Sequence, residues 1–451
     1  MNNTIDMSKR KLALDHKTLM QIEKPARYTG GELNSVYKSK AEICLRFCMC
    51  FPDIYEIGMS HLGISILYGM FNQYEDIWCE RVFSPWTDLH TIMKEKNIPL
   101  FALESQDPVK DFDFLGITLQ YEMCYTNILQ ILDLSHIPLH TLDRGMDEKL
   151  GTYPIVIGGG PCIYNPEPIA PFFDVFYIGE GEERYREIFD LYEDSKEKGL
   201  TRREFLRLLT HIEGMYVPSL YDIKYKEDMT LLSMTPIYED VPSTVKKQVV
   251  KNFDNTFYPV KPVVPFIRAT QDRIVLEVQR GCIRGCRFCQ AGQIYKPIRH
   301  KSVDQLVGYA KELIKNTGYE EMSLASLSTS DYPDLKNLLD QLIDLCNSKR
   351  INISLPSLRI DAFSLDVMSK VQDVRKTSLT FAPEAGSQRM RNVINKGLTK
   401  ENILNGAGMA FEGGWNKVKL YFMLGLPFET EEDIVEIANL SNDVAALYYE
   451  V

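Results

Sequence analysis

The sequence predicts an α/β protein, because short apolar runs typical of buried strands alternate with amphipathic helical patterns along most of its 451 residues. This alternation predicts a parallel, doubly wound sheet in residues 41–200, with ligand sites at the carboxyl ends of its strands. A second series of strand-helix units occupies residues 274–451. The strands expected in residues 41–200 are 45–51, 98–103, 112–119, 154–157 and 175–178, and the expected helices are 62–70, 86–96, 122–134 and 182–198.

The remaining segments divide the chain into four parts. Residues 1–40 are polar and weakly periodic, and we expect an N-terminal extension there. Residues 201–273 begin with a helical pattern at 201–211 and become rich in Tyr, Val and Pro, which predicts a small β-containing connector. The strands expected after it are 274–278, 321–327, 352–355, 377–381 and 418–424, and the expected helices are 303–313, 335–346, 363–371, 389–394, 401–411 and 431–446.

Composition excludes several classes of protein. No apolar run approaches the length of a membrane span, and the polar N-terminus is no signal peptide, so we expect a cytoplasmic protein without a membrane partner. A formal net charge of −11 disfavours non-specific binding of nucleic acid. Ten cysteines in a cytosolic chain indicate metal chemistry and buried thiols rather than disulfides.

Three of these cysteines stand close together directly after an expected strand. Cys282, Cys286 and Cys289 form a C-x3-C-x2-C pattern, and Gly281 and Gly285 supply the backbone freedom that a tight loop needs. Three thiolates hold three irons of a [4Fe–4S] cluster and leave the fourth iron open for reaction. A zinc site with a fourth ligand such as His300, or three unligated thiols, are the alternatives. We expect the other seven cysteines to pack in the core.

The cysteine pattern, with Phe288 before the last cysteine, resembles the cluster loop of the radical SAM superfamily. This resemblance implies a partial (β/α)6 barrel over residues 274–451, and S-adenosylmethionine bound to the open iron through its amino and carboxylate groups. It also implies a cellular electron donor and cleavage of S-adenosylmethionine to a 5′-deoxyadenosyl radical. The chain stops after the expected helix 431–446, where a sixth strand would follow, so we expect a truncated product or fragment that lacks the last strand.

Further motifs of that superfamily follow the cysteines in order. Residues 328–331 follow the second strand, where the family contacts the amino group of S-adenosylmethionine, and Pro356, Ser357, Arg359 and Asp361 follow the third. Residues 381–387 resemble the G-x-E-x-G-S element of methylthiotransferases, in which Glu, Ser and a following Arg contact S-adenosylmethionine, and residues 424–430 resemble the turn beside its adenine. The resemblance therefore implies contacts from Ser328, Ser330, Asp331, Glu384, Gly386, Ser387, Arg389, Gly425, Pro427 and Glu429.

Residues 41–200 resemble the cobalamin-binding (B12-binding) domain found ahead of many radical SAM barrels. The loop 53–63, the strand end 118–121 and the glycines Gly158, Gly159 and Gly160 carry this resemblance. Glycines let backbone approach the nucleotide tail of a ligand closely. The family's D-x-H-x-x-G motif supplies an axial histidine, whereas His61 here has no Asp two residues before it and its glycine comes one place early. His61 is thus either a cobalt ligand or a histidine that starts a helix, and we favour the latter.

Together these resemblances imply a radical SAM enzyme of the B12-binding-domain type, close to the bacterial group that carries this N-terminal domain. Its cofactors would be a [4Fe–4S] cluster and S-adenosylmethionine, with cobalamin as a candidate for assisting methyl transfer to the substrate or another functionalisation of a C–H bond. A methylthiotransferase-like enzyme without cobalamin and a non-catalytic metal-binding module are the alternatives. The substrate stays open, and tRNA and a ribosomal protein are candidates.

Overall fold

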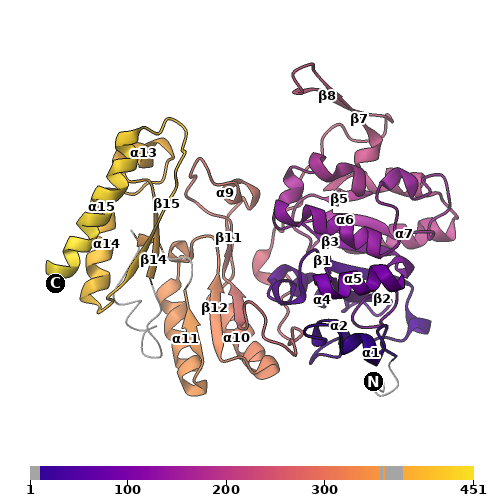
Figure 1. Ribbon diagram of the computed structural model, residues 1–451, viewed down its shortest axis with the longest axis horizontal. Coiled ribbons are helices and arrows are strands. Elements are labelled where there is room, and N and C mark those ends of the chain that lie inside the picture. Colours follow the sequence, from indigo (N-terminus) through magenta and orange to yellow (C-terminus); the bar gives the residue numbers. More distant parts are fainter. Residues whose placement is uncertain (1–10, 356–358, 361–378, 451) are drawn as a thin grey trace. The chain divides into compact units, whose positions relative to one another are not determined.

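The computed structural model describes residues 11–355, 359–360 and 379–450. The chain divides into two compact units, Met1–Asp272 and Arg273–Val451 (Figure 1). The predicted helix 363–371, the start of the predicted strand 377–381, and Pro356, Ser357 and Asp361 lie outside the described residues. No helix in the described part of the chain is both long enough and apolar enough to cross a membrane.

The first unit is built on one six-stranded sheet of order β2-β1-β3-β4-β5-β6, in which β6 alone is antiparallel to its neighbour. The order reverses between β1 and β3, and this switch point is the place where doubly wound sheets commonly bind ligands. The strands are β1 (Leu45–Phe51), β2 (Ile77–Phe83), β3 (Phe114–Thr118), β4 (Ile155–Gly159), β5 (Val175–Tyr177) and β6 (Met215–Tyr216); the helices are α1 (His16–Leu19), α2 (Ala26–Thr29), α3 (Tyr55–Gly58), α4 (Leu62–Phe71), α5 (Thr87–Lys96), α6 (Tyr125–Leu134), α7 (Tyr185–Glu197) and α8 (Arg202–Leu209).

One predicted strand of this unit is wrong. Residues 98–103 form no strand; Phe101 makes only an isolated bridge to Pro108. The strand beside β1 is β2 instead, which sequence patterning missed because the charged pair Glu80 and Arg81 interrupts its apolar run. Both charges are tolerated in a buried strand because each has an oppositely charged partner.

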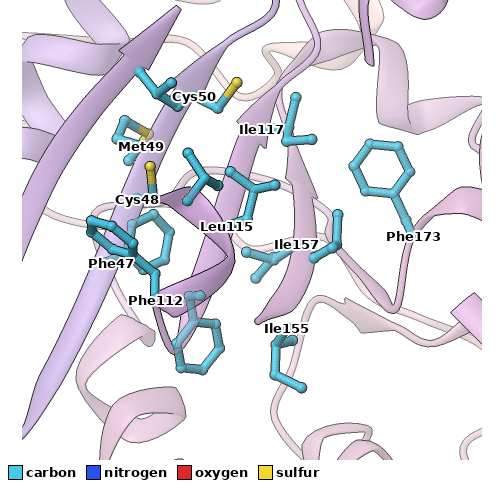
Figure 2. Packing of buried hydrophobic residues seen from close by; sticks show 14 of the residues in the cluster. Phe47, Cys48, Met49, Cys50, Phe112, Leu115, Ile117, Ile155, Ile157 and Phe173 are labelled. Carbon is cyan, nitrogen blue, oxygen red and sulfur yellow. The ribbon is translucent and has the colours of Figure 1, made fainter. Parts of the chain in front are cut away.

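The core of the first unit contains most of the cysteines outside the cluster loop. Figure 2 shows Cys48 and Cys50 of β1 among apolar side chains of the neighbouring strands. Burial raises the pKa of both thiols, so they stay protonated. The predicted core packing is confirmed for Cys48, Cys50, Cys79, Cys124, Cys162 and Cys346, whereas Cys44 is exposed.

A buried network of charges fastens the N-terminal segment to β2. The guanidinium of Arg81 donates to Glu104 Oε1 at 2.6 Å and to Glu32 Oε2 at 2.9 Å, and Tyr55 Oη donates to Glu32 Oε1 at 2.9 Å. Burial would raise the pKa of Glu32, but Arg81 outweighs this effect and holds that pKa below its ordinary value. The segment predicted as an extension is therefore anchored in the first unit by a buried ion pair.

The segment predicted as a connector also belongs to the first unit. It contributes α8, which packs against α7, and β6 at the edge of the sheet. It continues into an antiparallel hairpin of β7 (Tyr221–Tyr225) and β8 (Leu231–Pro236) (Figure 1). The backbone of Gln248 then lies against Gly179, beside the end of β5.

The second unit contains two groups of parallel strands. One sheet has the order β13-β12-β9, and β14 pairs with β15. A short antiparallel ribbon of β10 and β11 flanks the cysteine loop. The strands are β9 (Ile274–Glu277), β10 (Gln279–Arg280), β11 (Arg299–His300), β12 (Glu321–Ala325), β13 (Asn352–Ser354), β14 (Leu379–Glu384) and β15 (Val418–Phe422); the helices are α9 (Ala291–Ile294), α10 (Val303–Thr317), α11 (Leu335–Lys349), α13 (Gln388–Val393), α14 (Lys400–Glu412) and α15 (Glu431–Glu450).

Gly386 allows the end of β14 to touch the backbone of α15. A Cβ atom at this position would lie 2.2 Å from the backbone nitrogen of Ile437 and 2.4 Å from the carbonyl carbon of Glu436. Backbone cannot swing aside as a flexible side chain can. The glycine predicted as a contact for S-adenosylmethionine therefore has a packing role that is visible in the fold.

We expect Arg81→Met to lower the free energy of unfolding of the first unit by about 3–5 kcal/mol, because Glu32 and Glu104 would be left buried without their cation. Hydrogen exchange of peptides covering β2, followed by mass spectrometry, measures this loss. Lys94→Met is the matched control, since Lys94 pairs with Asp133 at the surface and its loss should cost about 0–1 kcal/mol. Equal protection in the two variants would contradict the role given to Arg81.

We expect Gly386→Ala to destabilise the packing of α15 by about 1–3 kcal/mol or more, because the new methyl group would overlap helix backbone. Faster hydrogen exchange in peptides of α15 would report it. Gly408→Ala is the control: it lies inside α14 with no atom within 4 Å of the added Cβ, so it should stabilise that helix by about 0.5–1 kcal/mol. Undisturbed exchange of α15 in Gly386→Ala would refute this packing role.

Candidate functional site

The three candidate metal ligands lie on the loop that follows β9 and β10. Cys282, Cys286 and Cys289 are half-buried and form no disulfide. The loop starts at Gly281, whose φ is +91° and whose Cβ, if present, would lie 2.8 Å from the carbonyl oxygen of Tyr295. Only glycine fits this close turn. The sequence thus folds the loop back on itself and presents three thiols from one short segment.

The thiols are free, but they do not converge. Among the described residues, no three His, Cys, Asp or Glu side chains are close enough together to hold a metal ion, and this includes His300, the candidate fourth ligand for zinc. Burial raises the pKa of Cys286, the charges of Lys396 and Arg359 oppose that rise, and Cys289 and Cys282 add to it. Three free thiols on one short loop are nevertheless the donor set of an iron–sulfur cluster with one open iron.

A turn after α13 clasps the cysteine loop. The backbone N–H of Arg287 donates to the carbonyl of Ile394 at 2.9 Å, and Asn395 Nδ2 donates to the carbonyl of Gly285 at 2.8 Å. Lys396 Nζ lies 5.9 Å from the ring centroid of Phe288. These contacts join residues more than 100 positions apart, so the fold of the second unit holds the loop in place in addition to the turn at Gly281.

A second anchor ties the same loop to the end of β12. Arg284 forms a salt bridge with Asp331, and its Nε donates to Asp331 Oδ2 at 2.9 Å. Burial would raise the pKa of Asp331, but the bonds from Arg284 hold it below its ordinary value. Ser330 Oγ accepts from the backbone N–H of Arg359 at 2.9 Å, and Ser328 is buried beside them. The structure therefore gathers these three predicted residues next to the cysteine loop.

The end of β14 carries the next predicted group. Glu384 adopts a φ of +68° and accepts from Lys396 Nζ at 3.1 Å. Ser387 caps α13 by accepting from the backbone N–H of Met390 at 3.0 Å. Glu384 thereby connects the end of β14 with the turn that clasps the cysteine loop.

Asp433, at the start of α15, was missed by sequence reasoning. Both Ser387 and Arg389 donate to its carboxylate, and the backbone N–H of Thr430 donates to it at 3.0 Å. The bonds from Arg389 and Ser387 hold the pKa of Asp433 far below its ordinary value. The Thr430-x-x-Asp433 spacing, which resembles a helix-capping box, was the available signal. Ser387 and Arg389, predicted to contact S-adenosylmethionine, thus donate hydrogen bonds to a carboxylate of the protein in this structure.

The turn after β15 contains the last predicted group. Gly425 donates its backbone N–H to Glu429 Oε2 at 2.6 Å, and the N–H of Glu429 donates to the carbonyl of Leu426 at 3.1 Å. Pro427 lies exposed within this turn. Phe428 beside it has 82% of its surface exposed, so an apolar side chain faces solvent after this strand in the described structure.

His61 of the first unit starts a helix. Its Nδ1 accepts from the backbone N–H of Ile64 at 3.4 Å as the N-cap of α4, and its ring lies 5.4 Å from that of Phe51. Burial lowers the pKa of His61, and a hydrogen bond with Gln120 opposes this only in part. The ring is therefore neutral and its Nδ1 is already engaged.

The three consecutive glycines after β4 differ in their surroundings. An added Cβ at Gly158 would lie 2.6 Å from the ring of Phe176, and one at Gly160 would lie 2.6 Å from the carbonyl oxygen of Leu119. Gly159 faces open space. Of the three, Gly159 is thus the position that a ligand at this edge of the sheet can approach without displacing protein atoms.

Side chains from the loops that follow β1 and β3 connect the two strand ends at the switch point of the sheet. Tyr121, after β3, donates its hydroxyl to Asp53, after β1. Gln120 lies between His61 and Gly160, with its Nε2 3.0 Å from where a Cβ of Gly160 would be. The structure therefore brings His61 and the glycines to the same edge of the sheet, around Gln120.

Two family models match the two stretches of the chain. The model described as "Radical SAM proteins, N-terminal" covers residues 63–218, and the model of the radical SAM superfamily covers residues 276–441. The uncharacterised protein MJ0966 of Methanocaldococcus jannaschii is 33% identical over 398 residues, which span 87% of this chain and 72% of that protein. The threonylcarbamoyladenosine tRNA methylthiotransferase MtaB of Aquifex aeolicus is 25% identical over 42% of this chain and 45% of its own.

Solved structures with a similar fold cover most of this chain. The cobalamin-dependent S-adenosylmethionine radical enzyme OxsB, with aqua-cobalamin and S-adenosylmethionine bound, matches with a TM-score of 0.57 and 15% identity over 88% of this chain. This chain spans about half of the OxsB chain, 51%. The radical S-adenosylmethionine methyltransferase TsrM from Kitasatospora setae matches with a TM-score of 0.54 and 14% identity, over 89% of this chain and 71% of its own.

At these identities the solved structures establish the fold: a Rossmann-like domain followed by a radical SAM domain. The relative from M. jannaschii and the match over the cysteine loop establish kinship. The chain therefore belongs to the radical SAM superfamily.

Proposed function

We propose that this chain is a radical SAM enzyme whose Cys282, Cys286 and Cys289 hold a [4Fe–4S] cluster with one open iron. The observation that carries the proposal is the loop itself, which offers three free thiols and is fixed from two sides by protein contacts. When bound, the cluster supplies the electron that cleaves S-adenosylmethionine to a radical able to take a hydrogen atom from the substrate. The protein supplies the ligands, their orientation and the exclusion of water.

The residues at the strand ends would form the S-adenosylmethionine site. Several of them already have protein partners: Asp331 holds Arg284, Ser387 and Arg389 hold Asp433, and Glu429 closes its own turn. We infer that these side chains mainly fix the backbone of the site, because a preorganised site loses less conformational entropy when the ligand binds. The same role extends to Ser328, Ser330, Glu384, Gly386, Gly425 and Pro427.

We further propose that the first unit binds cobalamin at the switch point between β1 and β3. The sheet order, the open space at Gly159 and the structural likeness to cobalamin-dependent enzymes support this. His61 would not ligate cobalt, because its Nδ1 accepts from the N–H of Ile64, so that Nε2 of the neutral ring carries the hydrogen and has no lone pair for a metal. Cobalamin held in this way would serve methyl transfer to the substrate.

A methylthiotransferase-like reaction without cobalamin is the second candidate, and the similarity to tRNA methylthiotransferases favours it. Its substrate would be tRNA or a ribosomal protein. The net charge of −11 gives no support for a polyanionic substrate. Either reaction needs a cellular electron donor, and free thiols suit a reducing compartment such as the cytoplasm.

Replacing any one of Cys282, Cys286 or Cys289 by Ala should remove the cluster and all cleavage of S-adenosylmethionine. Electron paramagnetic resonance of anaerobically reconstituted, dithionite-reduced protein tests this directly. The unaltered protein should give a [4Fe–4S]+ signal that changes shape when S-adenosylmethionine is added. Cys44→Ala, at an exposed cysteine in the first unit, should leave the signal intact. Retained activity in a Cys282, Cys286 or Cys289 variant would overturn the assignment.

Protein reconstituted with cobalamin and reduced to the cob(II)alamin state should show no splitting of its paramagnetic resonance lines by a histidine nitrogen. His61→Gln should give the same spectrum and bind the same amount of cobalamin, because the hydrogen bonds of His61 go to Ile64 and Gln120 and the proposal gives it no role at cobalt. A nitrogen splitting that disappears in His61→Gln would show that His61 is the axial ligand after all.

A further inference from the structure

Lys396 occupies the junction between the cysteine loop and the end of β14. Its side chain is only 12% exposed, and its Nζ donates to Glu384 Oε1 at 3.1 Å. The Glu384 side chain is 17% exposed, so this ion pair is largely shielded from water. Lys396 also faces the ring of Phe288, the residue immediately before Cys289.

The position of Lys396 is fixed by its neighbours in the chain. Its backbone N–H donates to the carbonyl of Arg391 at 2.8 Å, which closes the turn after α13. Asn395 directly before it has a φ of +53° and reaches Gly285 between the first two cysteines. The turn that delivers Lys396 is thus the same turn that clasps the cysteine loop.

The positive charge of Lys396, held beside the cysteine loop, stabilises any anionic group that the loop binds. Reduction of an iron–sulfur cluster adds one negative charge, and nearby charge and solvent exposure set the reduction potential. A shielded cation is screened less than one in water, so its effect extends across several ångströms.

We propose that Lys396 is a positioning residue that holds a positive charge beside the cysteine loop and raises the reduction potential of the cluster. The negative charge of Glu384 partly offsets this effect. The inference rests on the proposed function, since it requires the cluster. The ion pair then has a role beyond packing. Lys396 makes reduction of the cluster more favourable, and Glu384 limits how far the reduction potential rises.

The experiment is a redox titration of the reconstituted full chain, monitored by electron paramagnetic resonance in the absence of S-adenosylmethionine. Lys396→Met should shift the midpoint potential to more negative values at unchanged iron content, and Lys396→Arg should stay near the unaltered protein. Glu384→Gln should shift the potential in the opposite direction, because it removes the negative charge and leaves the cation. Lys400→Met is the matched control: Lys400 is exposed, pairs with Asp443 on α15 and should leave the potential unchanged.

Opposite shifts in Lys396→Met and Glu384→Gln would support the proposal, because a pair that only holds the fold would lose iron or stability in both variants alike. If Lys396→Met loses the cluster, the sign of the shift in midpoint potential in Glu384→Gln decides, and a shift to more positive values supports the proposal. Unchanged potentials in both variants, or loss of iron in both, would overturn the proposal. Absence of a cluster in the unaltered protein would instead overturn the proposed function, so the two failures are distinguishable.

Discussion

The cysteine loop depends on two ion pairs that bracket it. Arg284 ties it to Asp331 at the end of β12, and Lys396, within the turn that grips Gly285, is tied to Glu384 at the end of β14. β9 and β12 are parallel neighbours in one sheet, so Arg284 and Asp331, on the loops after these strands, meet although they are far apart in sequence. Glu384 belongs to the separate pair of β14 and β15, and the turn after α13 brings Lys396 to it. A loop of ten residues with two glycines has little structure of its own. Its conformation is supplied by the strands that these pairs connect.

The polar residues around this loop mostly bind one another. Asp433 gathers Ser387, Arg389 and Thr430, and Gly386 packs against the backbone of α15. A helix that closes over the end of a strand needs both a small residue at the contact and a partner for its own N-terminus. The residues that resemble radical SAM motifs, among them Gly386, Ser387 and Arg389, therefore have structural roles in this chain.

The first unit shows the same reliance on buried charge. Arg81 sits within a buried strand and binds Glu104 together with Glu32, which arrives from the N-terminal segment. Such an arrangement is stable only when every charge has a partner, and it places the segment at one position on the sheet. Near the switch point, His61 and Gln120 are likewise bonded to protein groups, and Gly159 provides the open approach.

The sequence by itself determined the features that are local. The spacing of Cys282, Cys286 and Cys289 indicated the candidate metal ligands, and apolar periodicity located β1 and most helices, because period and spacing depend on nearby residues. The tertiary structure alone decided which charges become neighbours. It revealed β2, whose charged pair hid it from patterning, and it joined Asp433 to Arg389 and Lys396 to the cysteine loop. Ion pairs between distant residues leave no periodic trace, since only the packed sheet brings their partners within bonding distance.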